Sequence, residues 1–330
     1  TGAADRAAGT PLTVDNLFLA GSTGKTFFAA VALQLIEEGR LDLDARVSTY
    51  LGSRPWFTRL PNAGDVTVRH LMTHTSGIVR YEMDPKFTAA LRAQPDKVWT
   101  PEEEVAFQFD ATPPFAAGQG WDYSDTNYIV LGMIVEGITK SSFYDEISRR
   151  LLRPLDLQHV VPSTSRRIPG LVPGYAGPRD PLGLPDEMMV TGELVINPQF
   201  EWAGGGFATS PLDLARWGRE LYAGRAISPS ARKMMLDAAV PARLGPDTKY
   251  GLGVIVRSTT PVGPTWGHSG FFPGYQTELI YVPDLGASLA IQINTSAPRA
   301  TGGRSLLRVL YDVAAMIRPP VGSLCAITDR

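Results

Sequence analysis

Ser22 and Lys25 are the two residues whose types and spacing most directly suggest chemistry. They follow a short apolar run, residues 17–20, which turns at Gly21 and opens into a helical pattern of apolar residues ending near Gly39. Because three residues make nearly one helical turn, the two side chains share a face. A lysine desolvated by apolar neighbours can lose its proton near neutral pH and help activate the serine as a nucleophile.

Two other interpretations of this segment stay open. Gly24-Lys25-Thr26 between an apolar run and a helix is typical of a phosphate-binding loop, but the full Gly-x-x-x-x-Gly-Lys-Ser/Thr pattern needs a glycine where Leu19 stands. Alternatively, Ser22 is only the cap of an ordinary helix. The rest of the chain argues against the nucleotide-binding loop, because it lacks the alternating strands and helices that build a parallel sheet.

A Ser–Lys nucleophile also needs a second proton carrier and a site for the oxyanion. Tyr123-Ser124-Asp125 offers a phenol, a hydroxyl and a carboxylate within three residues. A neighbouring lysine ammonium lowers the pKa of a tyrosine, so that its phenolate can act as a base. The alternative is that Asp125 caps the next helix and Tyr123 lies in the core.

The four histidines are weaker candidates. His268 lies within Trp266-Gly267-His268-Ser269-Gly270, a predicted strand whose glycines permit close approach of a ligand or a backbone, although a single histidine is commonly structural. His70 and His74 have the i, i+4 spacing of zinc ligands but lack the glutamate of the metalloprotease motif. We therefore expect no metal. A serine–histidine–acid triad is not favoured, since Ser22 lacks the Gly-x-Ser-x-Gly elbow.

Composition is that of a globular protein. Of the 330 residues 44% are hydrophobic and 19% are charged, which suits a sizeable core and argues against disorder. The net charge of −2 suggests no nucleic-acid or anionic-membrane partner, and no apolar run reaches the length of a membrane span. The single cysteine, Cys325, excludes an intramolecular disulfide, which fits a cytoplasmic or an exported bacterial protein. No signal segment is visible from Thr1 onward, so the compartment is not readable.

The order of predicted elements places helices in the middle of the chain and an antiparallel sheet towards its end. Residues 154–198 are rich in proline and glycine, and we expect a long loop that shapes a binding site or is mobile. Gly204-Gly205-Gly206 predicts a tight turn before a helix capped by Thr209 or Ser210, with Asp213 as in a capping box. The expected helices include 128–136, 141–153, the helix ending near 222, and 303–317; the expected strands are 249–258, 264–270, 274–282 and 287–294, with a hairpin turn at 283–286.

These motifs, taken in order, resemble the penicillin-recognising serine hydrolases. That family includes class C β-lactamases, DD-peptidases, D-amino-acid amidases and esterases of β-lactamase fold. The resemblance lies in Ser22-x-x-Lys25, in Tyr123-Ser124-Asp125 about a hundred residues later, and in His268-Ser269-Gly270 near the end. Two further segments are similar to family patterns, His70-Leu71-Met72-Thr73-His74-Thr75-Ser76-Gly77 and the glycine turn at 204–206 with the helix entry that follows it.

The resemblance implies a role for each matching position. Ser22 is the acylated nucleophile, Lys25 its proton partner, and Tyr123 the general base and then the acid for the leaving group. The backbone N–H groups of Ser22 and Phe271 form the oxyanion hole. The substrate-binding positions are Asp125, His268, Ser269 and Gly270. No metal or organic cofactor is implied.

Two of these positions depart from the commonest pattern of the family. His268 stands where its β-lactamases carry lysine, and a neutral imidazole attracts a substrate carboxylate less than an ammonium does. Efficient β-lactam hydrolysis is therefore less expected. Asp125 stands where asparagine is commonest, and its negative charge is expected to favour substrates that carry an amine or lack an acidic group.

The family's usual first helix and strands are not found before Ser22. Residues 321–328 instead have the pattern of a strand, and we expect this C-terminal piece to occupy the place of the first strand, as in a permuted chain.

We therefore expect an α/β (α+β) fold, with an antiparallel sheet domain formed by residues 1–20 and 204–330, a mainly helical domain formed by 21–203, and the active site in the cleft between them. The expected function is a serine hydrolase of peptidase, D-amidase or esterase type, acting through an acyl-enzyme on a small-molecule or peptide substrate. The alternatives are a class C-like β-lactamase and a non-catalytic ligand-binding homologue. The resemblance favours a periplasmic or secreted location, and the oligomeric state is open.

Overall fold

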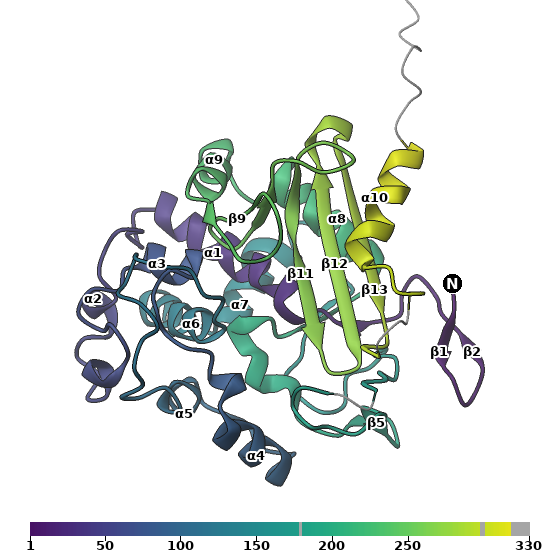
Figure 1. Ribbon diagram of the computed structural model, residues 1–330, viewed down its shortest axis with the longest axis horizontal. Coiled ribbons are helices and arrows are strands. Elements are labelled where there is room, and N and C mark those ends of the chain that lie inside the picture. Colours follow the sequence, from purple (N-terminus) through teal and green to yellow (C-terminus); the bar gives the residue numbers. More distant parts are fainter. Residues whose placement is uncertain (178–179, 298–300, 318–330) are drawn as a thin grey trace, which may run out of the picture.

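The structure is a computed structural model in which residues 1–177, 180–297 and 301–317 are described. Its centre is a six-stranded antiparallel sheet, the main sheet, in the order β13-β12-β11-β10-β9-β8 (Figure 1). The strands are β8 (Val240–Pro241), β9 (Thr248–Tyr250), β10 (Ile255–Arg257), β11 (Thr265–Phe272), β12 (Tyr275–Val282) and β13 (Ala287–Ile293). This confirms the predicted mixed fold of helices and an antiparallel sheet. The sheet is built from the last third of the described chain.

Two helices cover opposite faces of this sheet. Successive strand residues point to opposite sides, so Leu279 and Ile280 of β12 mark the two faces. Leu279 packs against Gly218 of α8 (Pro211–Tyr222), whereas Ile280 belongs to an apolar cluster with Leu310 of α10 (Leu306–Ile317). Both faces of the sheet are therefore buried, as its apolar strands require.

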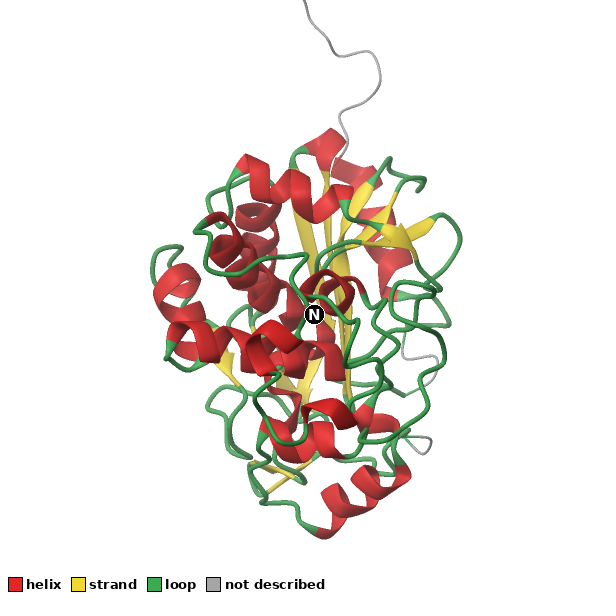
Figure 2. Ribbon diagram, turned by 90° about the vertical axis from the view of Figure 1, so that its left-hand side faces the viewer, coloured by secondary structure: helices red, strands yellow, loops and turns green. Residues whose placement is uncertain are grey.

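The remaining helices gather beside the strands, as Figure 2 shows. Two of them, α1 (Lys25–Glu37) and α6 (Thr126–Thr139), are apolar almost all round and lie within the core, which is why neither shows a clear polar face in sequence. The ring of Phe27 in α1 stacks on Trp217 of α8 at 4.1 Å and joins this region to the main sheet. The others are α2 (Ser48–Leu51), α3 (Val68–Thr73), α4 (Pro85–Ala93), α5 (Pro101–Ala106), α7 (Phe143–Ile147) and α9 (Pro229–Asp237).

A small three-stranded sheet fixes the turn that carries Ser22. β7 (Phe207–Thr209) lies between β3 (Phe18–Leu19) and β4 (Val160–Pro162), and it follows directly on the glycines 204–206. The chain leaves β3 into a 3₁₀ turn, η1 (Gly21–Gly24), and continues as α1. Two short hairpins, β1 (Ala3–Asp5) with β2 (Thr10–Pro11) and β5 (Met189–Val190) with β6 (Glu193–Leu194), lie outside these sheets.

Some local predictions are corrected. The segment 141–153 is not one helix, because α7 ends at Ile147 and a π-helical turn (Ser148–Leu152) follows. Ser22 is not a helix cap, since α1 begins after Gly24 without any side-chain cap. Ser210 does cap α8 by accepting a hydrogen bond from the Asp213 N–H, but the Asp213 carboxylate turns to the His159 N–H instead of completing a capping box.

The strand expected at 321–328 lies beyond the described residues. The division into two domains at residues 20/21 and 203/204 stays a prediction. Among the described helices none is both long and apolar enough to cross a membrane.

Candidate active site

The turn at Ser22 packs directly on strand β11. Gly21 has φ +52°, and a Cβ atom there would lie 2.6 Å from the backbone nitrogen of Phe271, so only glycine fits this close approach. β11 pairs with β10 only as far as Gly267, which leaves its edge from His268 onward to face η1. Ser22 is partly exposed there, beside the backbone of Phe271. The two N–H groups proposed for the oxyanion hole thus come from neighbouring backbone segments.

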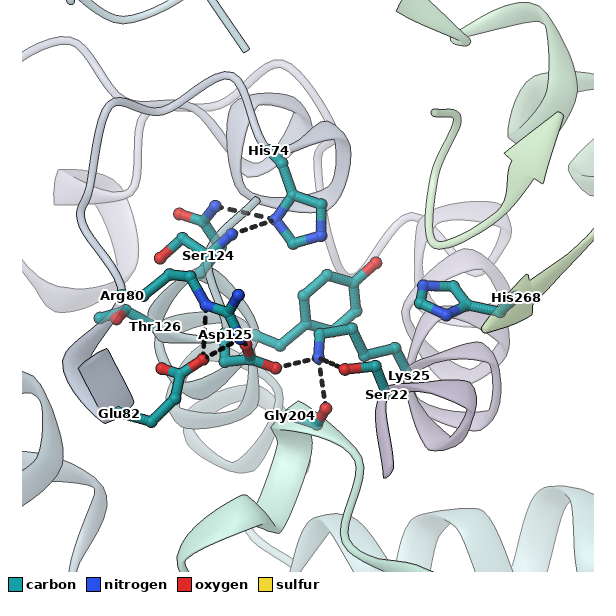
Figure 3. Close-up of polar contacts among 12 residues, drawn as sticks. Ser22, Lys25, His74, Arg80, Glu82, Ser124, Asp125, Thr126, Gly204 and His268 are labelled. Atoms are coloured by element: carbon teal, nitrogen blue, oxygen red, sulfur yellow. Dashed lines mark hydrogen bonds and ion pairs between the residues drawn. The ribbon is translucent and has the colours of Figure 1, made fainter. Parts of the chain in front are cut away.

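Lys25 lies one turn beyond Ser22 and is fully buried. Its Nζ is surrounded by three oxygen acceptors: Ser22 Oγ at 3.1 Å, the Asp125 carboxylate and the Gly204 carbonyl, both in closer contact (Figure 3). The Gly204 carbonyl is presented by the segment 198–204, in which Trp202 has the strained φ of +28°. The prediction that Ser22 and Lys25 share one face agrees with this geometry.

Asp125 directly precedes α6 at its N-cap position, yet its side chain makes no cap hydrogen bond. One carboxylate oxygen contacts Lys25, and the other accepts a hydrogen bond from Arg80 Nη2 at 3.0 Å. Burial opposes ionisation of this carboxyl, but Lys25, together with Glu82 and Arg80, holds its pKa far below the usual range. Asp125 is therefore an anion shared by two cations, and its interpretation as a simple helix cap is wrong.

Behind Asp125 lies a second carboxyl, Glu82, which is 8% exposed. One of its oxygens pairs with Arg80 at 2.6 Å, while no hydrogen-bond donor in the described part of the chain reaches the other, Oε2. Burial and the neighbouring charge of Asp125 raise the pKa of Glu82 well above its ordinary value. Near neutral pH this side chain is consequently a neutral acid beside an ionised one.

Tyr123 lies against the ring of His74, 4.2 Å between centroids, and 5.0 Å from Lys25 Nζ measured to its ring centroid. Its hydroxyl oxygen is buried, with no partner of normal hydrogen-bond geometry among the described residues. Burial and the Asp125 charge raise the pKa of Tyr123 well above 10, and the nearby Ser22 hydroxyl only partly offsets them. Burial and Asp125 thus favour the neutral phenol, and the role of Tyr123 as the general base stays a prediction.

His268 is buried in β11 and uses both ring nitrogens. Because a carbonyl can only accept, Nδ1 donates to the Ser269 carbonyl at 2.7 Å, and Nε2 accepts from the Tyr250 hydroxyl at 2.8 Å. Burial and the charge of Lys25 lower the pKa of His268 to about 3, so the ring is neutral. His268 therefore lines the cleft beside Ser22 without offering a cation or a free donor to a substrate.

The two other histidines considered as candidates, His70 and His74, make separate hydrogen bonds. His70 accepts a hydrogen bond from the Thr67 N–H in the capping box of α3. His74 lies in the left-handed conformation at the end of α3, and its Nδ1 contacts the Asn127 amide at 3.1 Å. Burial and Lys25 lower the pKa of His74 well below 6.5. These rings support the loop that carries Tyr123 and do not converge on one ligand position.

Two cavities meet at Ser22. The first, which we call the acidic pocket, has a volume of about 490 Å³, including space open to solvent, and has the carboxyls of Glu82, Asp125 and Glu201 in its lining. Its other lining residues are Ser22, Arg80, Tyr81, Met83, Pro181, Leu182, Phe200, Gly204, Phe271, Phe272 and Pro273. The second, which we call the cleft, is wider, about 1180 Å³, and contains Tyr123, His268–Phe271 and the guanidinium groups of Arg257 and Arg304. Ser22, Arg80 and Phe271 belong to both.

Sequence reasoning missed Arg80, Glu82, Glu201 and Arg257. The first two follow the His-Thr-Ser-Gly segment by three and five residues, and Glu201 precedes the glycine turn, so proximity to recognised motifs was the available signal. Arg257 gave no signal, because its place beside the cleft depends on the pairing of β10 with β11.

Comparison with known proteins agrees with this architecture. The family model described as Beta-lactamase matches residues 1–311. A D-stereospecific amidohydrolase from Streptomyces sp. is 32% identical, with a TM-score of 0.76 over 85% of this chain and 83% of that one. The D-amino acid amidase from Ochrobactrum anthropi SV3, complexed with L-phenylalanine amide, is 25% identical, with a TM-score of 0.77 over 96% and 86%.

A penicillin-binding protein also aligns with most of this chain. Penicillin-binding protein 4* of Bacillus subtilis (strain 168) is 29% identical over 279 residues, which cover 82% of this chain and 59% of the relative. The match thus spans less than two thirds of that protein's length.

The buried neutral state of His268 predicts a pH dependence of stability. Between pH 6.5 and about 3 the unfolded chain binds a proton at this histidine and the folded chain does not, so the free energy of unfolding falls as pH decreases. His268→Gln removes this contribution, and from pH 6.5 to 4.5 the variant should lose about 2 kcal/mol less than the wild type. Urea denaturation at the two pH values measures the difference.

The matched control is His159→Gln, since the His159 ring is 45% exposed. An equal pH response of wild type and His268→Gln would contradict the neutral assignment of His268.

Proposed function

Because the chain belongs to the β-lactamase family, we propose that it is a serine hydrolase in which Ser22 is acylated by a small amide or ester. The observation that carries the proposal is the hydrogen bond of 3.1 Å between Lys25 Nζ and Ser22 Oγ. Asp125 and the Gly204 carbonyl occupy the two other directions around Nζ. Once Lys25 has lost a proton, its two remaining hydrogens are held by these acceptors and its lone pair faces the serine.

The proposed reaction follows from this arrangement. As Ser22 Oγ attacks the acyl carbon, its proton moves to Lys25, and the carbonyl oxygen becomes an oxyanion received by the N–H groups of Ser22 and Phe271. The leaving group takes up a proton from Tyr123, whose high pKa suits a neutral acid and which is reprotonated from Lys25. Water then attacks the acyl-enzyme by the reverse path and restores Ser22.

We further propose that the acyl part of the substrate carries a primary ammonium group. Glu201 lines the acidic pocket, and its Oε2 is buried without a hydrogen-bond partner in the described ranges. Burial raises the pKa of Glu201 to about 8, because Lys25 offsets the loss of solvent only partly. An ammonium beside this carboxyl would favour its ionised form, while Phe200 and Phe272 offer an apolar surface for a side chain. Similarity to a D-stereospecific amidohydrolase and to a D-amino acid amidase supports this substrate class.

A matched pair of substrates tests the proposal. We expect hydrolysis of D-phenylalanine amide, and Glu201→Gln should raise its KM about tenfold, the effect of losing about 1.4 kcal/mol of charge pairing. N-acetyl-D-phenylalanine amide lacks the ammonium, so its KM should be almost unaffected by the substitution. Steady-state kinetics with both enantiomers measures these values, with Ser22→Ala as the inactive control.

Equal effects of Glu201→Gln on the two substrates would contradict an ammonium site at Glu201. Full activity of Ser22→Ala would contradict the nucleophile.

A second candidate function is the release of a leaving group that bears a carboxylate, as in a carboxypeptidase or with a β-lactam. It is favoured by Arg257, which is 8% exposed, lines the cleft and has an Nη1 without a hydrogen-bond partner among described residues. Its nearest carboxylate oxygen, on Glu278, is 3.7 Å away. The Arg257 cation would attract a substrate carboxylate, which the neutral His268 does not.

On this second candidate, Arg257→Gln should raise the KM of a D-dipeptide with a free carboxylate about tenfold but leave that of the corresponding D-dipeptide amide nearly unchanged. Steady-state kinetics with the two peptides measures both KM values. An equal rise of KM for the two peptides would exclude a contact between Arg257 and the substrate carboxylate.

A further inference from the structure

Arg257 and Glu278 form an incomplete pair in the wall of the cleft. Arg257 belongs to β10 and Glu278 to β12, and β11 lies between these two strands. The two residues are 8% and 6% exposed, and both line the cleft that contains Ser22. The distance from Arg257 Nη2 to Glu278 Oε1 is 3.7 Å, which is too long for a hydrogen bond.

Each of these side chains keeps one buried polar atom that has no hydrogen-bond partner among the residues described. On Arg257 this atom is Nη1, a donor, and on Glu278 it is Oε1, an acceptor. Burial raises the pKa of Glu278, and Arg257 and Ser269 only partly offset this effect. Because an unpaired buried polar atom is costly, a bound group that supplies both an acceptor and a donor would be stabilised here.

The pair lies close to the reacting atoms along the main sheet. Glu278 is directly opposite Ser269, which is two residues before Phe271 in β11. Two strand residues span about 7 Å, and an extended substrate advances about 3.5 Å per residue. The side chains of Arg257 and Glu278 can therefore reach a group one residue beyond the cleaved bond. Since the acyl part is proposed to occupy the acidic pocket, the cleft is left for the leaving group.

We propose that Arg257 and Glu278 bind a carboxamide of the leaving group, whose oxygen accepts from Arg257 Nη1 and whose N–H donates to Glu278 Oε1. The inference rests on the hydrolase function proposed above, and it competes with the second candidate, in which Arg257 binds a carboxylate. A substrate carboxylate offers no N–H to Glu278 and is repelled whenever Glu278 is ionised. The substrates implied are D-aminoacyl peptides in which the residue after the cleaved bond continues as a peptide or ends in an amide.

Three peptides with one acyl part test this complementarity in the wild type near neutral pH. D-phenylalanyl-glycinamide carries the carboxamide, D-phenylalanyl-glycine carries a carboxylate, and the N,N-dimethylamide of D-phenylalanyl-glycine keeps the carbonyl but has no N–H at that position. Steady-state kinetics should give the carboxamide a KM about tenfold lower than that of either other peptide, the effect of one unmet buried hydrogen bond.

Variants locate the preference. Glu278→Gln keeps the size of the side chain and removes its charge, so the preference for the carboxamide over the carboxylate should fall from about tenfold to about twofold or less. Arg257→Gln should raise the KM of the carboxamide peptide about tenfold. Glu187→Gln, which changes an exposed glutamate outside the cleft, is the matched control and should keep the wild-type preference. A merely structural role of Glu278 would change both KM values in parallel.

An equal or lower KM for the carboxylate peptide in the wild type would overturn the inference, as would a preference that Glu278→Gln leaves unchanged. An equal KM for the carboxamide and its dimethyl derivative would overturn the contact with Glu278. If none of the three peptides is cleaved while D-phenylalanine amide is hydrolysed, the inference fails and the proposed hydrolase stands. Undiminished hydrolysis by Ser22→Ala would overturn both proposals.

Discussion

The contact between Lys25 and Asp125 joins two parts of the chain that are 100 residues apart and places a full ion pair in the interior. Such a pair costs desolvation energy, and removal of Asp125 would leave the buried charge of Lys25 without its carboxylate, at a cost of about 3–5 kcal/mol. The surroundings reduce this cost: Arg80 binds the second oxygen of Asp125, and the Gly204 carbonyl accepts from Lys25. The geometry around Ser22 depends on these contacts, because they fix the direction in which Nζ faces the serine.

Close backbone approach holds this network against the main sheet. Gly21 is packed on Phe271, and a Cβ on Gly205 would lie 3.1 Å from the Ser22 nitrogen. The small sheet connects the start of the serine turn to the strand that follows the glycines 204–206. The site is therefore assembled by four segments, the turn after β3, the entry to α6, the segment that ends at Gly204 and the edge of β11, none of which contains more than a part of it.

Much of the fold was predictable because its signals are local. Alternating apolar residues and the turn at 283–286 indicated the strands, and the Ser-x-x-Lys spacing placed two side chains on one face. Electrostatic detail was not predictable, since it depends on contacts between distant segments. The raised pKa of Tyr123 was not predictable, because it results first from the burial of the hydroxyl by the surrounding chain and then from the charge of Asp125. The use of both nitrogens of His268 required the position of Tyr250 in β9, which is separated from β11 by β10.

The central claim is that Ser22 becomes acylated, and rapid acid quenching followed by intact-mass measurement tests it most directly. The protein is mixed with p-nitrophenyl acetate, quenched at increasing times and digested to locate any added acetyl group. The account predicts one acetyl group per molecule, present within the first turnover, located on the peptide containing Ser22 and absent from Ser22→Ala. An acetyl group that appears at the same rate in Ser22→Ala, or on another residue of the wild type, would contradict it.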